Sequence, residues 1–549
     1  MDEIVIGIDR VPDLELKVGD ISGMSAEKLR ETRKRIDSLA MACEEELDYE
    51  DGYRRSALPG PYSRLTKASD ALELKKKIFA RDGNYSRLVA RLGEIATTEL
   101  EIRETDIRQR QATFERFRSD TDVKTARDKV GSMWGKKKIL IPELGEVSLA
   151  QMKDGYVHPN EDVRKATLEA ALSLDDLEAV ALPAIKTLND KVRQDQQFPH
   201  FVEVQAHYSE LPKAAVLEEM MRTFVVGTKK LYEALFRELI SNEPVKTWNL
   251  DFLISKRDPF FRAEVPREPE KLFAIAKELF EKIGYKPELL NCLFDRTRPG
   301  VFIDLEPRQG KLGSATFSLG AESFGKNVMV HNPANYETDP RRRWYTLPHE
   351  FAHAVHYEMS RRAAVVYGAA FFVENTVTTE TITSIHQALA MEKKAWLGHI
   401  LDVDERELQK WNVFTDLRRM YGNINLSIGE IGMHCHGVEK AREKFHEARE
   451  LTKPEMLEGI RPSSSYAGVT HVWNTPGSLF PYVFGDFYAI AVLQKLRETF
   501  GSTISPDTAP FLIEHLMTGN ITPMHERVVK ATGTTDIVEN AVRYFNEKK

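Results

Sequence analysis

The sequence has few of the features that mark secreted or membrane-spanning proteins. Only 3 of its 549 residues are cysteine, at positions 43, 292 and 435, and their odd number and wide spacing argue against a disulfide framework. No apolar stretch approaches the length of a membrane span, and the N-terminal residues carry acids where a signal peptide needs bases. These absences predict a cytoplasmic protein with no membrane partner.

Positive charge is not in excess either. Lys and Arg number 77 against 84 Asp and Glu, which gives a net charge of −7 at pH 7. A chain with this balance is not expected to bind nucleic acid. With 42% hydrophobic and 29% charged residues, the composition is that of an ordinary globular protein and excludes collagen-like and disordered classes.

Helical periodicity dominates most of the chain. Apolar residues recur at helical spacing through residues 25–130, and Asn160 is a good N-cap for a helix that follows it. Further helices are predicted over 212–239 and 268–283, the second ending at Gly284, where a left-handed cap costs little. Short β-favouring runs at 301–305, 314–319 and 327–331 predict a small sheet within an otherwise helical protein.

The strongest chemical signal is His-Glu-Phe-Ala-His at residues 349–353. Residues four apart share one face of a helix, so both imidazoles, His349 and His353, can bind one metal ion. Glu350 lies about 100° round the helix, within reach of a water on the metal, which is the position that a general base needs. A helix that starts near Pro348 and an earlier helix that kinks there both leave the motif helical.

A catalytic zinc site needs three protein ligands and one position left for water, so a third ligand must come from elsewhere. Gly368 interrupts the helical pattern and a second pattern follows, which predicts two antiparallel helices. Glu374, in the first turn of the second helix, is the favoured third ligand, and Glu380 is the alternative. Six residues turn a helix by about 240°, so the two carboxylates point in different directions.

The motif resembles that of the M3-type zinc oligopeptidases, the thimet oligopeptidases and oligoendopeptidases F, whose metal helix reads His-Glu-Phe/Leu-Gly-His with a further histidine after it, as His356 is here. Residues 372–374, Phe-Val-Glu, resemble the segment that holds the family's third ligand. Ala352 stands where the family has Gly, and the gap between the motif and Glu374 is shorter than usual, which keeps Glu380 open. The resemblance covers roughly residues 150–500.

The resemblance implies a mainly α fold with two helical lobes that enclose a deep channel and a small β-sheet near the zinc helix. We expect an N-terminal helical lobe over 1–145 and a catalytic region over 146–549, with a soft boundary. In the family, a histidine and tyrosines near the C-terminus bind the substrate carbonyl and the oxyanion. The best-matched positions here are His471 and Tyr482, followed by Tyr488.

The resulting hypothesis is a zinc endopeptidase with one Zn²⁺ per chain that cleaves short unfolded peptides. Its ligands are His349, His353 and a glutamate, with Glu350 as general base. Two alternatives stay open. A metallocarboxypeptidase would use a similar zinc ion but needs a cationic group for the substrate's terminal carboxylate. A non-catalytic helical protein would bind peptides and use its zinc structurally, although Glu350 argues against this.

Overall fold

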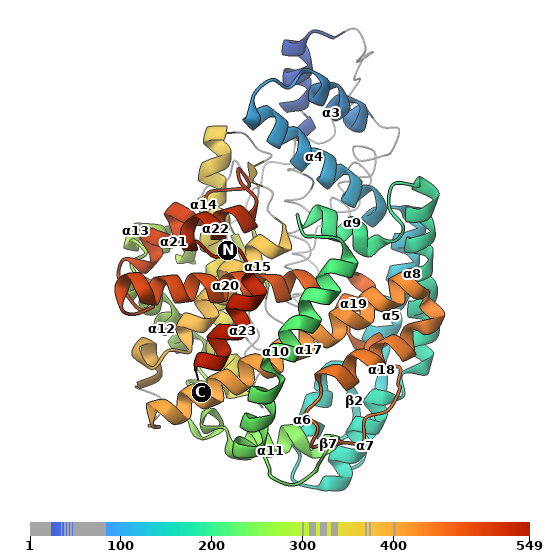
Figure 1. The fold of residues 1–549 in the computed structure, drawn as a ribbon, viewed down its shortest axis with the longest axis vertical. Coiled ribbons are helices and arrows are strands. Elements are labelled where there is room, and N and C mark those ends of the chain that lie inside the picture. The colour runs from blue at the N-terminus through green and yellow to red at the C-terminus, as the bar shows by residue number, and fades with distance from the viewer. Residues whose placement is uncertain are drawn as a thin grey trace.

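The computed structural model describes residues 24–34, 36–37, 40, 43, 47, 84–298, 301–306, 315–318, 327–330, 339–367, 371–372, 375–398 and 402–548. These residues form a mainly α-helical protein, as predicted (Figure 1). Residues 48–83, where further helices are expected, lie outside the described part of the chain. No helix of the described residues is both long and apolar enough to cross a membrane.

Long helices alternate with short ones along the chain. The helices before the largest sheet are α3 (Asn84–Ile95), α4 (Glu99–Arg118), α5 (Thr121–Lys136), α6 (Lys153–Tyr156), α7 (Glu161–Leu172), α8 (Asp175–Asp195), α9 (Phe201–Tyr208), α10 (Ala214–Leu239), α11 (Leu250–Arg257), α12 (Pro269–Lys282) and α13 (Pro287–Phe294). Those after it are α14 (Pro340–Tyr367), α15 (Thr376–Ala390), α17 (Glu405–His436), α18 (Ala441–Thr452), α19 (Thr470–Asn474), α20 (Leu479–Phe500), α21 (Thr508–His515), α22 (Met524–Thr532) and α23 (Ile537–Glu547).

Local sequence signals explain several helix ends. Asn160 caps α7, and its side chain accepts a hydrogen bond from the backbone N–H of Asp162, as its position predicts. The predicted helices over 212–239 and 268–283 correspond to α10 and α12. Gly284 follows α12 with a φ of +102°, a backbone conformation that glycine adopts more easily than other residues.

The predicted small sheet is present and lies against α14. Its strands are β4 (Val301–Asp304), β5 (Ala315–Ser318) and β6 (Asn327–Val330), in the order β4-β6-β5. Strand β6 runs parallel to β4 and antiparallel to β5, so β5 is an edge strand among the described residues. Two smaller pairs join β1 (Lys138–Ile141) to β2 (Gly145–Ser148) and β3 (Val245–Lys246) to β7 (Leu457–Glu458).

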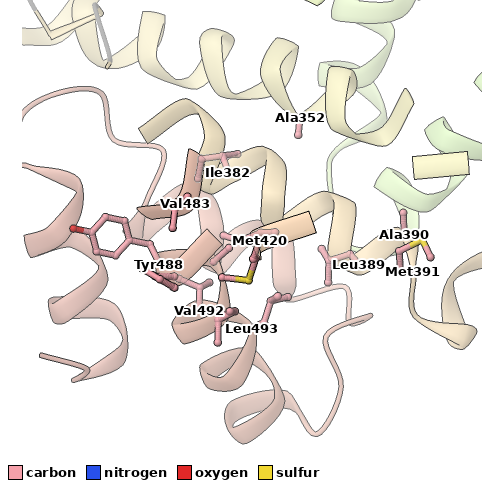
Figure 2. Close-up of a cluster of buried hydrophobic side chains, with 14 of the residues drawn as sticks. Ala352, Ile382, Leu389, Ala390, Met391, Met420, Val483, Tyr488, Val492 and Leu493 are labelled. Carbon is pink, nitrogen blue, oxygen red and sulfur yellow. The ribbon is translucent and has the colours of Figure 1, made fainter. Parts of the chain in front are cut away.

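Two separate hydrophobic cores define two helical lobes. The larger core gathers apolar side chains from α10, α12, α14, α15, α20 and α23, and Figure 2 shows part of it. The smaller core joins α5, α7 and α8 to β1 and to the segment around Trp473. Helix α17 belongs to both, because most of its buried residues pack in the larger core whereas Met433 packs in the smaller one. Its 32 residues span about 48 Å, enough to bridge the two lobes.

Helices α3 and α4 lie at one end of the long axis, and α7 and α11 lie at the other (Figure 1). Helix α3 packs against α4 over a small apolar core of its own that includes Leu88 and Leu92. The predicted boundary between residues 145 and 146 falls within the β1–β2 hairpin. The division into a lobe over 1–145 and a catalytic region over 146–549 stays a prediction.

Candidate metal centre and active site

The histidine motif lies in the middle of α14, which continues through Pro348. Of the two possible helix starts, the structure has the earlier one, at Pro340, so Pro348 lies inside the helix. The rings of His349 and His353 stand edge to face with their centroids 4.9 Å apart. The four-residue spacing therefore brings both imidazoles to one face, as the sequence predicts.

Glu380 of α15 completes a three-residue cluster with these histidines. Its carboxylate oxygens lie 3.8 Å from Nε2 of His349 and 3.7 Å from Nε2 of His353. One candidate ligand atom from each of the three residues lies within 4.8 Å of the other two. Among the described residues this is the one cluster of three or more His, Cys, Asp or Glu side chains with such spacing.

The favoured third ligand of the sequence analysis, Glu374, lies outside the described residues. Helix α15 begins at Thr376, after the N-cap Asn375, whose side chain accepts the N–H of Thr378. Glu380, the alternative, lies in the second turn of this helix and faces α14. The geometry of the described residues favours Glu380.

The protonation states of the cluster suit a cation. Burial lowers the pKa of His349 to about 4 and also lowers the pKa of His353 well below its ordinary value, so both imidazoles are neutral at pH 7. Burial, followed by the charge of Glu350, raises the pKa of the Glu380 carboxyl to about 8. The contacts are therefore not ion pairs. Neutral imidazoles and a buried carboxyl that lacks a counter-charge are what a divalent metal ion would stabilise.

Glu350 is buried beside this cluster, and a residue of the small sheet forms a hydrogen bond with its side chain. The hydroxyl of Thr316, in β5, donates a hydrogen bond of 2.7 Å to Oε2 of Glu350. The influence of Glu350 on the pKa of Glu380 shows that the two carboxyl groups are neighbours. Strand β5 and α14 together therefore fix the side chain predicted to be the general base.

Tyr482 also reaches the cluster, and His471 lies beside Tyr482. The Tyr482 hydroxyl donates a hydrogen bond to Glu380, and the charge of Glu380, followed by burial, raises the pKa of Tyr482. The ring of His471, in α19, stands edge to face with the Tyr482 ring at a centroid distance of 5.9 Å. The structure thus brings together residues more than 100 positions apart in the sequence.

Tyr488 does not join them. It follows Tyr482 by six residues on α20, which turns its side chain by about 240°. Its ring lies 6.0 Å from that of His525, and burial, followed by the charge of Glu210, raises its pKa. Figure 2 shows the Tyr488 hydroxyl pointing away from the labelled hydrophobic side chains, among which Ala352 marks α14.

The residues that support this arrangement were not predicted from the sequence. Asp486, one turn after Tyr482, accepts hydrogen bonds from Ser384 (2.9 Å) and from Arg419 of α17 (2.7 Å). A single acid in the apolar run of α20 is a signal that could have drawn attention to Asp486. A Cβ on Gly485 would lie 3.1 to 3.2 Å from the backbone of α15 at Glu380, so glycine allows the two helices to approach closely.

A cavity of about 600 Å³ lies along α14 and α15, one to two turns from the metal cluster, although no residue of the cluster lines it. Arg342 and Tyr345 line it from α14, seven and four residues before His349 and thus on the same helix face. Gln387, seven residues after Glu380, lines it from α15. Tyr156, whose helix α6 lies beside the smaller core, lines the other side, so the cavity lies between the two lobes.

The chain has the fold of several solved peptidase structures. PZ peptidase A with inhibitor 2 is similar at a TM-score of 0.60 and 14% identity, over 95% of this chain and 98% of that one. A putative oligoendopeptidase F from Bacillus anthracis str. Ames is similar at a TM-score of 0.61 and 13% identity, over 95% of each chain. The M32 carboxypeptidase from Deinococcus radiodurans R1 has a TM-score of 0.61 and 14% identity, over 95% and 98% of the two chains.

No family model and no curated protein matches the sequence. The structural similarities extend over nearly the whole chain and support the helical architecture with a channel between lobes. At this level of identity they show the fold alone.

Proposed function

We propose that this protein is a zinc-dependent endopeptidase that hydrolyses peptide bonds in short unfolded peptides. The observation that carries the proposal is the cluster of His349, His353 and Glu380, with the buried carboxyl of Glu350 beside it. The peptidases of the same fold support the same class of reaction.

The donor set suits zinc. Two imidazoles and one carboxylate are a common ligand set of catalytic zinc sites, which leave one position open for water or substrate. We assign His349, His353 and Glu380 as the ligands, one zinc ion per chain. The lowered pKa of both histidines favours binding, because a metal ion competes with protons for the same nitrogen lone pairs.

A bound Zn²⁺ would polarise the scissile carbonyl and lower the pKa of the attacking water. Glu350 then takes the proton from that water and later delivers it to the leaving amine. The hydrogen bond from the Thr316 hydroxyl holds one carboxylate oxygen of Glu350 in place for this proton exchange. Burial of this side chain, which is 4% exposed, keeps bulk water away from the transfer.

Tyr482 and His471 supply donors for the negative charge that develops on the substrate carbonyl oxygen. In this structure the Tyr482 hydroxyl binds Glu380. A substrate oxygen that enters beside Glu380 meets the same hydroxyl, and the neighbouring His471 ring can add a second donor. Tyr488, with its neighbours His525 and Glu210, has no part in this proposal.

Strand β5 offers a place for the substrate backbone. It is an edge strand of the sheet, and Thr316 in this strand contacts the proposed base. An extended peptide that pairs with β5 would pass beside the metal centre. Recognition through the peptide backbone would make few demands on side chains, which fits an enzyme for varied short peptides.

Two measurements on the full chain test the proposal. Zinc content after dialysis should approach one ion per chain. Turnover of a peptide library should then be compared between the parent protein and Glu350→Gln, which keeps the size of the side chain but cannot accept a proton at neutral pH. We expect activity to fall by at least ~10²-fold with unchanged zinc content. Equal turnover by the two proteins would rule out Glu350 as the base.

A metallocarboxypeptidase is the second candidate, favoured by the arginine side chains that line the adjacent cavity. Its reaction requires a free terminal carboxylate, so matched peptides with free and amidated C-termini distinguish the two activities. An endopeptidase cleaves both peptides, and a carboxypeptidase cleaves only the free acid. Zinc binding with no cleavage of any peptide would favour the non-catalytic peptide-binding protein.

A further inference from the structure

The cavity beside the metal centre carries charged side chains on several helices, and most of them are neutralised in pairs. Arg418 of α17 is paired with Asp251 of α11. Arg341 of α14 makes two hydrogen bonds to Asp258, at 3.0 and 3.1 Å. These pairs leave little charge for a ligand to meet.

Arg449 of α18 differs from these arginines. It is half-buried and lines the cavity, and its guanidinium has no hydrogen bond or ion pair with any described residue. Burial lowers its pKa from the ordinary value, and the charges of Tyr156 and Glu450 offset only part of this effect. The nearest acid that acts on it, Glu450, is bound to Lys453 at 2.7 Å.

Tyr156 is the neighbour of Arg449 across the cavity. Its hydroxyl also has no hydrogen bond with any described residue, and it lies close enough to Arg449 that each shifts the pKa of the other. The acid that acts on Tyr156, Asp251, is already paired with Arg418. An arginine and a phenol hydroxyl supply several N–H donors and one O–H donor. Such a pair is suited to bind a carboxylate, and guanidinium binds that group with two parallel hydrogen bonds.

The packing of α17 against α18 shows how far Arg449 lies along the cavity from Arg419, the cavity residue whose charge acts on His349. Helices α17 and α18 pack antiparallel, with Phe445 against Gly429, so Arg449 lies opposite Asn425. Arg419, whose charge acts on His349, lies six residues before Asn425, or about 9 Å along α17. An extended chain needs about three residues to cover that distance.

The other unpaired charge in the cavity lies at its opposite end. Asp416 of α17 has no hydrogen bond or ion pair within the described part of the chain, and the first charge that acts on it is that of Arg419, near the metal centre. The cavity thus has an acid toward α14 and an unpaired cation toward α18. A bound peptide with its negative group toward α18 would match this polarity.

We propose that Arg449 and Tyr156 bind a carboxylate of the peptide substrate, at least about three residues from the scissile bond. The proposal rests on the proposed peptidase function and names its preferred substrates as peptides with a carboxylate at this distance. The carboxylate is either the C-terminus or the side chain of Asp or Glu, since both present the same group to the two donors.

The test uses one cleavable peptide core in three forms: a free C-terminal acid, the C-terminal amide, and the amide with a glutamate placed three to five residues from the cleavage site. The variants are Arg449→Gln and Tyr156→Phe. The matched control is Arg222→Gln, which removes an exposed arginine of α10 that is paired with Glu218 outside the cavity. Thermal unfolding verifies that each variant is folded.

We expect the parent protein to prefer the carboxylate-bearing peptides, and Arg449→Gln to lower kcat/KM for them by at least ~10-fold, mainly through KM. Tyr156→Phe should have a smaller effect in the same direction. Cleavage of the neutral amide and all rates of Arg222→Gln should stay at the parental level. The peptide whose kcat/KM falls in Arg449→Gln, the free acid or the glutamate-containing amide, identifies the source of the carboxylate.

An equal loss on all three peptides, or no loss on any, would refute the carboxylate site while leaving the peptidase function standing. Binding of the same peptides, fluorescently labelled, is measured in parallel by anisotropy. If no peptide is cleaved, the proposed function fails on its own. The carboxylate site would still be supported by weaker binding of the acid peptides to Arg449→Gln, and refuted by equal binding.

Discussion

Glu430 should make the stability of this protein fall as the pH rises. The residue lies on α17, is fully buried, and accepts the backbone N–H of Gly477 at 2.7 Å through one oxygen, while its other oxygen has no partner among the described residues. Burial raises the pKa of the Glu430 carboxyl from the ordinary 4.5 to about 8. Its hydrogen bond holds the segment between His471 and Tyr482.

The sign follows from the bound protons. Between pH 4.5 and 8 the folded protein keeps a proton on Glu430 that the unfolded chain releases. The folded state therefore binds more protons, and its stability decreases as the pH rises through this range. Over most of this pH range, each pH unit lowers the free energy of unfolding by about 1.4 kcal/mol. Glu430 alone therefore lowers it by about 3 kcal/mol between pH 5 and 8.

Glu430→Gln should remove that dependence. The amide is uncharged at every pH, and its carbonyl oxygen can still accept the N–H of Gly477. We expect the free energy of unfolding of the variant, relative to the parent, to rise by about 3 kcal/mol from pH 5 to pH 8. Chemical unfolding of both proteins at several pH values measures the difference, in which the contributions of all other groups cancel. Parallel pH profiles for the two proteins would refute the reasoning.

Three further predictions concern the metal centre. Glu380→Ala should lose most of its zinc and Glu374→Ala should keep it, as measured by metal content after dialysis; the reverse order would make Glu374 the ligand. Tyr482→Phe should keep zinc and lower kcat by about 10²- to 10³-fold with a smaller change in KM, because a lost oxyanion donor acts mainly in the transition state. His471→Ala should behave in the same way, and parental rates for both variants would place the oxyanion site elsewhere.

The local part of the site could be predicted because it depends on one helix. The spacing of His349 and His353 sets them on one face of any helix that contains them, whatever packs around it. Pro348 left two helix starts open in the sequence. In the structure α14 begins at the earlier one, Pro340. The strands and the helix starting after Asn160 were predictable for the same reason, since local propensity and capping decide them.

The third carboxylate could not be chosen locally. The choice between Glu374 and Glu380 depends on where α15 begins, and Asn375, as its cap, starts the helix later than apolar periodicity alone suggests. It also depends on how α15 packs against α14 and α20. Gly485 permits a close approach at Glu380, and nothing in the sequence near Glu380 reports that contact.

The sequence alone therefore indicated the fold class, the two histidines of the metal cluster and the adjacent carboxylate proposed as base, because each follows from residue type and local spacing. Only the tertiary structure shows that Glu380 faces the histidines, that Tyr482 reaches Glu380, and that Arg449 and Tyr156 share a cavity with the metal helix. These relations join elements up to about 300 residues apart, and the packing of helices against one another sets them.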